Sequence, residues 1–500
     1  MLKIGWSQKD VSTTDQVCIP GQFYCRISKG ILDPIMLSCL VMDDGEDCAI
    51  FLSGDFVSAA GVIDTIREKL NKKRNDIPSE KVLISATHTH DGPLVQKTNS
   101  YFDAPHDKVE LTMPDKYREF MTDMAVEAVE EAWDNREEGS FSYGYGYAVV
   151  GHSRRVEYLD DLSKRNNSGD ATYKSQWVDG HVKMYGKTND DLLSGYEGGA
   201  DHFINLLYTF NVNNELTGAV INVPCPSQNS ENEWLLSASF WNEVRINLRK
   251  KYGNIKILPQ CAAGGDTAPR ILHYKEAQKR RFKIKYKDYE MDPRIASQTE
   301  MYARLDIAER ICNAFDEVLS WCSDEKITDA PIKHTVKTIQ LERRLISDEE
   351  YQFASEELSA LEQGNYIDTG DALDDFVNNS KRACSMSRFR DIVKRYDAQK
   401  QSETAPMELH VIRIGDVAFA TNAFELYQNF QYRIQARSPF MQTFIIQLCG
   451  QPDGYLGGYL ATKRAVENKG YSATMYCNQI SAKGGQTLVD ETVAELKKLI

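Results

Sequence analysis

The sequence predicts an α/β (α+β) protein with two or more packed layers. Short apolar runs typical of buried strands alternate with amphipathic helical segments along all 500 residues. Hydrophobic residues make up 42% of the chain and charged residues 26%, values of a folded globular protein rather than a disordered one. The chain has no internal repeat and no low-complexity linker. We therefore expect one large domain over residues 1–500, although length alone suggests about three.

The first part of the chain supplies clear strand and helix signals. The run CAIFL at 48–52 predicts a buried strand, and residues 57–74 carry apolar side chains at helical spacing with a basic final turn that suits the helix dipole. The run KVLISA at 81–86 predicts the next strand. A helix over 115–133 and an alternating aromatic strand over 140–150 follow.

The rest of the chain continues the alternation. Two apolar runs around Asn-Asn-Glu predict a β-hairpin at 206–223. Further segments with the same signals are helices at 240–252, 301–321, 424–437 and 490–500, and strands at 255–258, 335–341, 408–420 and 443–448. Two segments read as insertions into this pattern: the polar residues 157–200 and the charged, helical residues 342–406.

Composition excludes several classes of protein. The net charge is −14 and the pI about 5.3, which argues against a nucleic-acid binder and against adhesion to an anionic membrane by net charge. No apolar stretch reaches the roughly 20 residues of a membrane span, so no membrane insertion is expected. The eleven cysteines include no CxxC pair, and the N-terminus has no apolar signal region. We expect a cytoplasmic protein with reduced thiols and a small-molecule substrate; the sequence does not predict its oligomeric state.

A His-Thr-His segment follows the predicted strand 81–86. In an extended chain, residues two apart point to the same side, so His88 and His90 would project together. Two imidazoles at a strand end are a common arrangement for binding a divalent metal. Two ordinary polar residues at a strand end would give the same pattern, and the two interpretations have similar weight.

Other segments have weaker signals. Cys225 stands between two prolines and is a metal ligand, a nucleophile or, most simply, a small buried residue. Small residues before Asp266 permit close approach of backbone to a ligand, or only a tight turn. Glu425 follows a strand at an expected helix start, where an acid suits the dipole. Arg154 can clamp a carboxylate or an oxyanion, although an adjacent arginine pair is more often a solvated or salt-bridged surface. The Gly-Tyr segment at 454–462 can surround a small ligand but is not specific for one.

The order of these segments resembles the catalytic domain of the neutral/alkaline ceramidase family. SATHTHDGP, SRR, CPSQ, GGDTAP, NAFEL and GYLAT occur in that order, and the resemblance covers nearly all 500 residues. It implies a layered α/β/β/α sandwich core with helical and loop insertions. It also implies a zinc ion and hydrolysis of an amide by a metal-activated water.

The resemblance assigns roles to particular residues. His88, Glu425 and Tyr459 would be zinc ligands, and Cys225 stands where the family has a second histidine ligand. His90 would position or shuttle protons. Further catalytic positions would be Arg154, beside the substrate carbonyl, together with Asp266 and Tyr459. Substrate-binding positions would be Thr267, Gln228 and Tyr455.

Two departures change the expected function. Cys225 replaces a histidine, and Ala268 stands where the family has a reactive serine. We also expect no signal peptide and no C-terminal immunoglobulin-like domain, so ceramide is a poor fit. The expected function is therefore a zinc-dependent hydrolase of an amide or ester bond in a small polar substrate. The alternatives are a non-hydrolytic lyase or carbohydrate-active enzyme on the same scaffold, and a non-catalytic binding protein.

Overall fold

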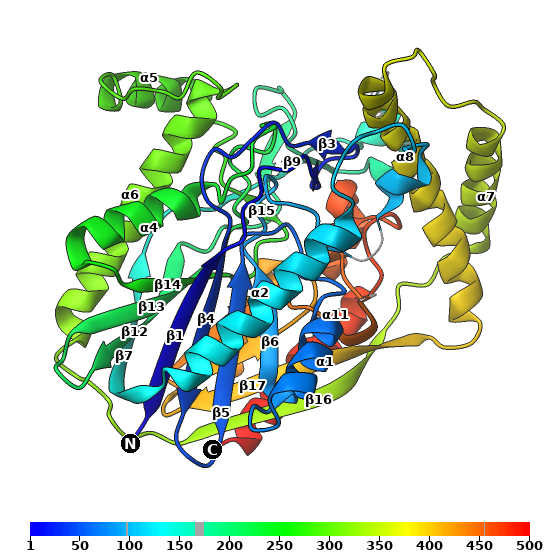
Figure 1. Ribbon diagram of the computed structural model, residues 1–500. Coiled ribbons are helices and arrows are strands. Elements are labelled where there is room, and N and C mark those ends of the chain that lie inside the picture. The colour runs from blue at the N-terminus through cyan, green and yellow to red at the C-terminus, as the bar shows by residue number, and fades with distance from the viewer. Residues whose placement is uncertain (97–98, 166–174, 455) are drawn as a thin grey trace.

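The computed structural model describes residues 1–96, 99–165, 175–454 and 456–500, and it has the expected layered α/β architecture (Figure 1). Two sheets pack face to face, and helices cover their outer faces. The larger sheet has the order β14-β13-β12-β7-β1-β4-β5-β6. Its strands are β1 (Lys3–Asp10), β4 (Met36–Asp43), β5 (Cys48–Gly54), β6 (Val82–Ala86), β7 (Glu137–Tyr147), β12 (Phe203–Asn211), β13 (Leu216–Val223) and β14 (Lys256–Cys261).

The second sheet has four strands in the order β16-β17-β18-β20. Their bounds are β16 (Ile332–Glu342), β17 (Thr404–Ile414), β18 (Val417–Thr421) and β20 (Gln442–Ile446). Most neighbours in both sheets are antiparallel. The pairs β5–β6, β13–β14 and β18–β20 are parallel, so each of these pairs ends at the same edge of its sheet.

Alternating apolar residues build the layers. Along β4, Cys39 and Val41 pack under the outer helices, whereas Leu40 and Met42 point into the interface between the sheets. Phe419 of β18 reaches the same interface from the opposite sheet. Both faces of the central strands are therefore buried, and this burial is the main source of stability.

Six helices complete an α/β/β/α sandwich. Residues of α1 (Ile63–Lys73), α2 (Pro114–Asp134), α4 (Phe240–Tyr252) and α6 (Gln298–Cys322) pack on the outer face of the larger sheet. Residues of α9 (Gln428–Arg437) and α11 (Ala482–Lys498) pack on the outer face of the smaller one. In the described ranges, no helix combines the length and apolarity that crossing a bilayer requires.

Some predicted elements differ from the structure. The helix expected from residue 57 begins at Ile63, and the helix expected from 424 begins at Gln428. The latter is delayed because Glu425 and Leu426 form the short strand β19 (Glu425–Leu426), which pairs in parallel with β21 (Tyr459–Leu460). A tertiary backbone pairing thus overrides the local helix signal around Glu425.

The two segments expected as insertions leave the sandwich. Residues 157–200 contribute to a three-stranded sheet of β9 (Arg155–Tyr158), β10 (Val182–Met184) and β11 (Leu193–Tyr196). Residues 342–406 form the helices α7 (Asp348–Glu362) and α8 (Ala372–Gln399), which stand beside the sandwich (Figure 1). The remaining short elements are β2 (Cys18–Ile19), β3 (Arg26–Ile27), β8 (His152–Ser153), β15 (Thr267–Ala268), α3 (Ser175–Val178), α5 (Lys275–Lys285) and α10 (Lys463–Asn468).

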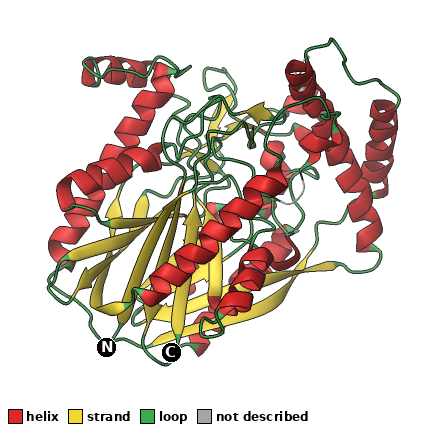
Figure 2. Cartoon of the chain, viewed as in Figure 1, coloured by secondary structure: helices red, strands yellow, loops and turns green. Residues whose placement is uncertain are grey.

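Loops gather at one end of the sandwich, opposite the two chain termini (Figure 2). The two sheets are joined at this end. The backbone N–H of Gln447, after β20, donates to the carbonyl of Cys261, the last residue of β14, and Ser85 of β6 forms a β-bridge with Cys449. The segments that follow β6, β13, β14, β18 and β20 therefore meet in one region.

A buried ion pair supports this end of the sandwich. Asp55, directly after β5, has no exposed surface, and its carboxylate contacts Arg245 of α4 at 2.7 Å. It also accepts hydrogen bonds from the backbone N–H of Met36 and from the hydroxyl of Thr87. One carboxylate thereby fixes two strand ends and a helix.

Replacement of Arg245 by methionine is expected to lower the free energy of unfolding by about 3–5 kcal/mol, because it leaves a buried carboxylate without its partner. Urea denaturation measures this. Lys72→Met is the control, since Lys72 pairs with Glu68 on the exposed side of α1 and its loss should leave the urea midpoint unchanged. Equal midpoints for the two variants would contradict the role of Asp55.

A second buried polar group makes stability depend on pH. His334 of β16 is enclosed between Cys48 and His410, whose Nδ1 lies 2.9 Å from His334 Nε2. Burial, and then the nearby His410, lower the pKa of His334 well below its usual value. The unfolded chain takes up a proton near pH 6.5 whereas the folded chain does not, so protonation favours unfolding as the pH falls.

His334→Gln should therefore flatten the fall in stability between pH 7 and pH 5, by up to about 1.4 kcal/mol per pH unit. Urea denaturation at both pH values tests this. Ile339→Val on the same strand removes packing without removing a titratable group, and it should keep the wild-type slope. An unchanged slope in His334→Gln would show that another group carries the acid sensitivity.

Candidate active site

The His-Thr-His segment does not continue as a strand. β6 ends at Ala86, and His88 has φ +62°, in the left-handed region that a non-glycine residue rarely adopts. The expected strand alternation is therefore not what brings the two imidazoles together. The turn at His88 does so instead, and it leaves His88 Nε2 and His90 Nε2 3.3 Å apart.

Neighbouring acceptors assign the protons on both imidazoles. His88 Nδ1 lies 2.6 Å from the carbonyl oxygen of Val57, so this nitrogen carries the hydrogen. His90 Nδ1 lies 3.4 Å from a carboxylate oxygen of Glu231, which favours a hydrogen there as well. Burial lowers the pKa of His90, so its ring is neutral at pH 7. His90 Nε2 then carries a lone pair that can accept a proton.

Glu425 and Tyr459 stand beside this pair. They are directly opposite each other in the parallel pair β19–β21. A carboxylate oxygen of Glu425 lies 3.4 Å from His88 Nε2 and 3.6 Å from Arg154 Nη2. Burial alone would raise the pKa of Glu425, but His88 and Arg154 outweigh it and the net shift is downward. Glu425 is therefore ionised, and its carboxylate faces His88.

Arg154 is held behind Glu425. Its Nη2 donates to the carbonyl of Gly265 at 2.9 Å and to the Tyr459 hydroxyl at 3.2 Å, and its Nη1 donates to the Tyr185 hydroxyl at 3.2 Å. Burial raises the pKa of Tyr459 well above its usual value, so its phenol is protonated in this arrangement. The guanidinium thus joins the two residues of the β19–β21 pair.

Cys225 is close in the fold but does not join this group. Its Sγ donates to the carbonyl of Pro226, and among the described residues no hydrogen bond joins the thiol to His88, Glu425 or Tyr459. Burial raises the pKa of Cys225 well above its usual value, which keeps the thiol protonated. Its role as a metal ligand stays a prediction.

The remaining predicted positions surround the group. Asp266 accepts a hydrogen bond from the backbone N–H of Gln428, the first residue of α9, and burial raises its pKa to about 6. The Thr267 hydroxyl donates to backbone carbonyls, and Gln228 Nε2 donates to the Tyr185 hydroxyl at 2.9 Å. Tyr455 lies outside the described residues. The roles predicted for these four positions stay predictions.

Sequence patterns did not indicate two further residues of the site, Tyr185 and Glu231. Tyr185 lies in the polar segment 157–200, takes a left-handed φ of +55° and bonds both Arg154 and Gln228. Glu231 pairs with Arg270 at 2.6 Å besides facing His90. Glu231 follows closely after Gln228, so nearness to the CPSQ segment was the one available signal.

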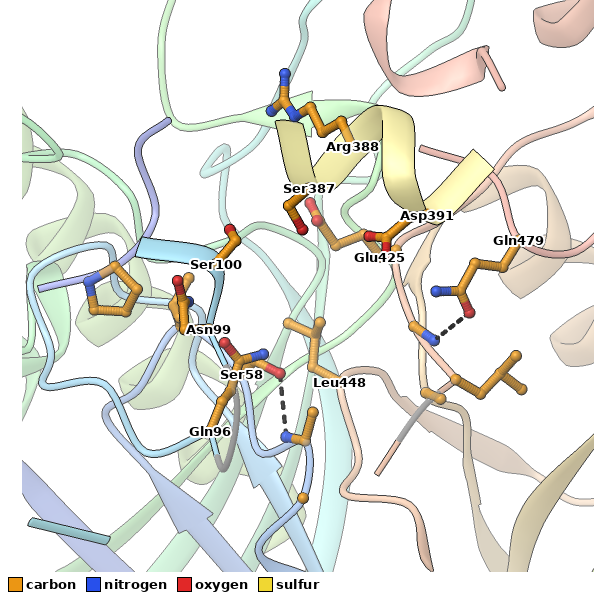
Figure 3. A pocket seen from close by; sticks show the side chains of 18 of the residues that line it. Ser58, Gln96, Asn99, Ser100, Ser387, Arg388, Asp391, Glu425, Leu448 and Gln479 are labelled. Carbon is orange, nitrogen blue, oxygen red and sulfur yellow. Dashed lines mark hydrogen bonds between the residues drawn. The ribbon is translucent and has the colours of Figure 1, made fainter. Parts of the chain in front are cut away.

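A cavity of about 1120 Å³ opens over the group, and His88 and Glu425 line it. Figure 3 shows Glu425 among the lining side chains. Its other walls include the loop 20–23, the residues 57–65 that lead into α1, and helix α8. Among the described positions predicted for the site, only His88 and Glu425 reach this cavity. His90, Arg154 and Tyr459 stand behind them.

The donor atoms fit a metal ion in part. Two ligands of a tetrahedral zinc ion, with bonds of roughly 2.0–2.1 Å, are separated by about 3.3 Å. The distance from His88 Nε2 to the Glu425 carboxylate oxygen, 3.4 Å, has this size. Within the described ranges, however, no set of three or more His, Cys, Asp and Glu side chains forms a complete metal-binding group. A metal here would need Tyr459 as a further donor.

No family model matches the chain, and no curated protein matches it in sequence. The solved structures that resemble it include two ceramidases. One is the neutral ceramidase from Pseudomonas aeruginosa, with a TM-score of 0.65, 14% identity, and coverage of 99% of this chain and 75% of that chain. The other is a ceramidase complexed with C2, with a TM-score of 0.63, 13% identity and the same coverage. The chain is therefore similar in fold to neutral ceramidases over nearly its whole length.

Proposed function

We propose that this chain hydrolyses an amide or ester bond in a small polar substrate, and that a divalent metal ion, zinc in first place, binds at His88, Glu425 and Tyr459. The observation that carries the proposal is the approach of His88 Nε2 to the Glu425 carboxylate, at 3.4 Å, where both residues line the cavity and Tyr459 lies directly opposite Glu425. The fold shared with ceramidases supports an amide hydrolase.

A divalent metal, when bound, supplies Lewis acidity that polarises the carbonyl under attack. His88 is oriented for such a role because its Nδ1–H is fixed by the Val57 carbonyl, which aims Nε2 at Glu425. The carboxyl group of Glu425 is already ionised at neutral pH and contributes a negative charge. Its position opposite Tyr459 is set by main-chain pairing.

His90 is the residue placed to move protons. Its Nε2 lies 3.3 Å from His88 Nε2, directly behind the cavity wall, while Nδ1 faces Glu231 at 3.4 Å. When Nε2 takes a proton, the Glu231 carboxylate stabilises the imidazolium, and Arg270 holds that carboxylate in place. Release of the proton to a leaving amine would complete the cycle. These roles of His90, Glu231 and Arg270 do not require a serine at position 268.

Arg154 and Tyr459 are placed to stabilise negative charge. The guanidinium donates to the Tyr459 hydroxyl, which in turn bonds the Glu425 carboxylate, and these two donors could stabilise an oxygen that gains charge during attack. Buried donors of this kind act strongly because water does not screen them.

Metal content is the first test. Protein purified without a metal-affinity tag, loaded with zinc and desalted, should hold about one zinc per chain by plasma mass spectrometry, and His88→Ala and Glu425→Gln should each hold less than about a tenth. The exposed His273→Gln is the control and should keep the wild-type content. Cys225→Ser decides the role of that thiol, since a retained ion would exclude it as a ligand. Less than about a tenth of a zinc in the wild type would refute the metal.

Loss of the proton carrier is the second test. On any N-acyl amide that the wild type cleaves, His90→Gln should lower kcat by about 10²–10⁴-fold while zinc content stays unchanged. His181→Gln, at an exposed site, serves as the control. A kcat within threefold of wild type would remove His90 from the reaction, and full activity after thorough chelation would show that the cleavage needs no metal.

A further inference from the structure

Helix α8 forms a polar wall of the cavity. Its lining residues recur at helical spacing along one face: Cys384, Ser387, Arg388, Asp391, Lys394, Arg395 and Ala398. The side chains of Ser387 and Asp391 lie on the side of α8 that faces Glu425 (Figure 3). The helix comes from the segment 342–406, which lies outside the sandwich, so the wall is built separately from the sheets.

The wall is held firmly at both ends. Near its start, Ser380 accepts a hydrogen bond from the backbone N–H of Cys25, in the loop that also forms the cavity wall at 20–23. Near its end, Arg395 donates to the carbonyls of Met475 and Asn478, each at 2.6 Å. Phe389 packs in a small core with Met475. The position of helix α8 is therefore fixed before a ligand arrives.

Three polar side chains in the cavity are available to a ligand. In the described part of the chain, no hydrogen bond or ion pair engages the Gln96 amide, the Ser387 hydroxyl or the Asp391 carboxylate, and all three line the cavity. Covering such groups with an alkyl chain would strip them of water and give nothing in return. A ligand that carries hydrogen-bonding groups would satisfy them.

The charges on the wall point to a neutral ligand. Asp391 and Glu425 face the same hollow and repel an anionic group. Lys394 and Arg395 lie on the same face of α8 and repel a cationic one. Arg388 stacks over the ring of Phe23 at 3.8 Å, so an aromatic and guanidinium surface lies beside the polar groups. Hydroxyl groups can donate to the carboxylate and accept from the amide and the guanidinium.

We propose that α8 is the specificity-determining wall of the site and that it recognises a neutral, polyhydroxylated group, as in an N-acylated amino sugar. The inference deepens the proposed function, on which it rests for the reaction but not for binding. The cavity of about 1120 Å³ has room for one or two sugar rings. A long apolar acyl chain is the substrate that this wall disfavours.

Binding of two amides with the same acetyl group tests the proposal. N,N′-diacetylchitobiose carries hydroxyl groups and N-hexylacetamide does not, and calorimetry on the full chain loaded with zinc gives both affinities. The wild type should bind the sugar amide at least tenfold more tightly. Asp391→Asn and Ser387→Ala should each weaken sugar binding about tenfold and leave N-hexylacetamide unchanged.

Ser385→Ala is the matched control, because Ser385 lies on α8 outside the cavity lining and its hydroxyl donates to the Lys381 carbonyl. It should bind both compounds as the wild type does. Tighter binding of N-hexylacetamide by the wild type, absence of sugar binding at 10 mM, or equal affinities in wild type and Asp391→Asn would each overturn the proposal. Sugar binding that depends on Asp391 without any release of acetate would instead refute the proposed hydrolysis and leave the role of α8 standing.

Discussion

The buried pair of Asp55 and Arg245 is the interaction on which the site depends. A charged carboxylate without exposed surface is tolerated only when hydrogen bonds and an opposite charge replace its water. Asp55 meets this condition by binding a helix, the start of β4 and the hydroxyl of Thr87. Thr87 directly precedes His88, so the residue that fixes the strand ends also fixes the strained turn that aims the imidazole. Stability and the geometry of the site are thus coupled through one side chain.

The sandwich explains why distant segments meet. Parallel neighbours within each sheet end at the same edge, and the two edges are joined by the contact of Gln447 with Cys261. Residues from β6, β19 and β21 and from the segment around Arg154 therefore reach one place although hundreds of positions separate them. Helix α8, which lies outside the sheets, adds a wall to the cavity. The shape of the cavity can therefore change without moving His88 and Glu425, which the sandwich holds in place.

Much of the layered fold was predictable because burial leaves a periodic pattern. The hairpin of β12 and β13 and the helix α4 lie where the sequence indicated them. Glu425 was misplaced at a helix start, because its partner in β21 lies far along the chain and no local pattern reveals a long-range backbone pairing. Tyr185 was missed for a similar reason: its left-handed conformation and its bonds depend on tertiary contacts. His88 and His90 were found, but the turn that joins them was not.

The pairing of Glu425 with Tyr459 has a consequence for variation among related chains. Their relative position is set by main-chain hydrogen bonds between β19 and β21, including the one from the backbone N–H of Glu425 to the carbonyl of Gly458. The intervening segment, which includes α9 and β20, does not determine that spacing. Insertions and deletions in the loops between these elements can therefore accumulate without moving the carboxylate relative to the phenol. Loops of different length are therefore compatible with the same Glu425–Tyr459 pair. A proline at position 425 would instead remove the backbone hydrogen bond to Gly458 that maintains this pair.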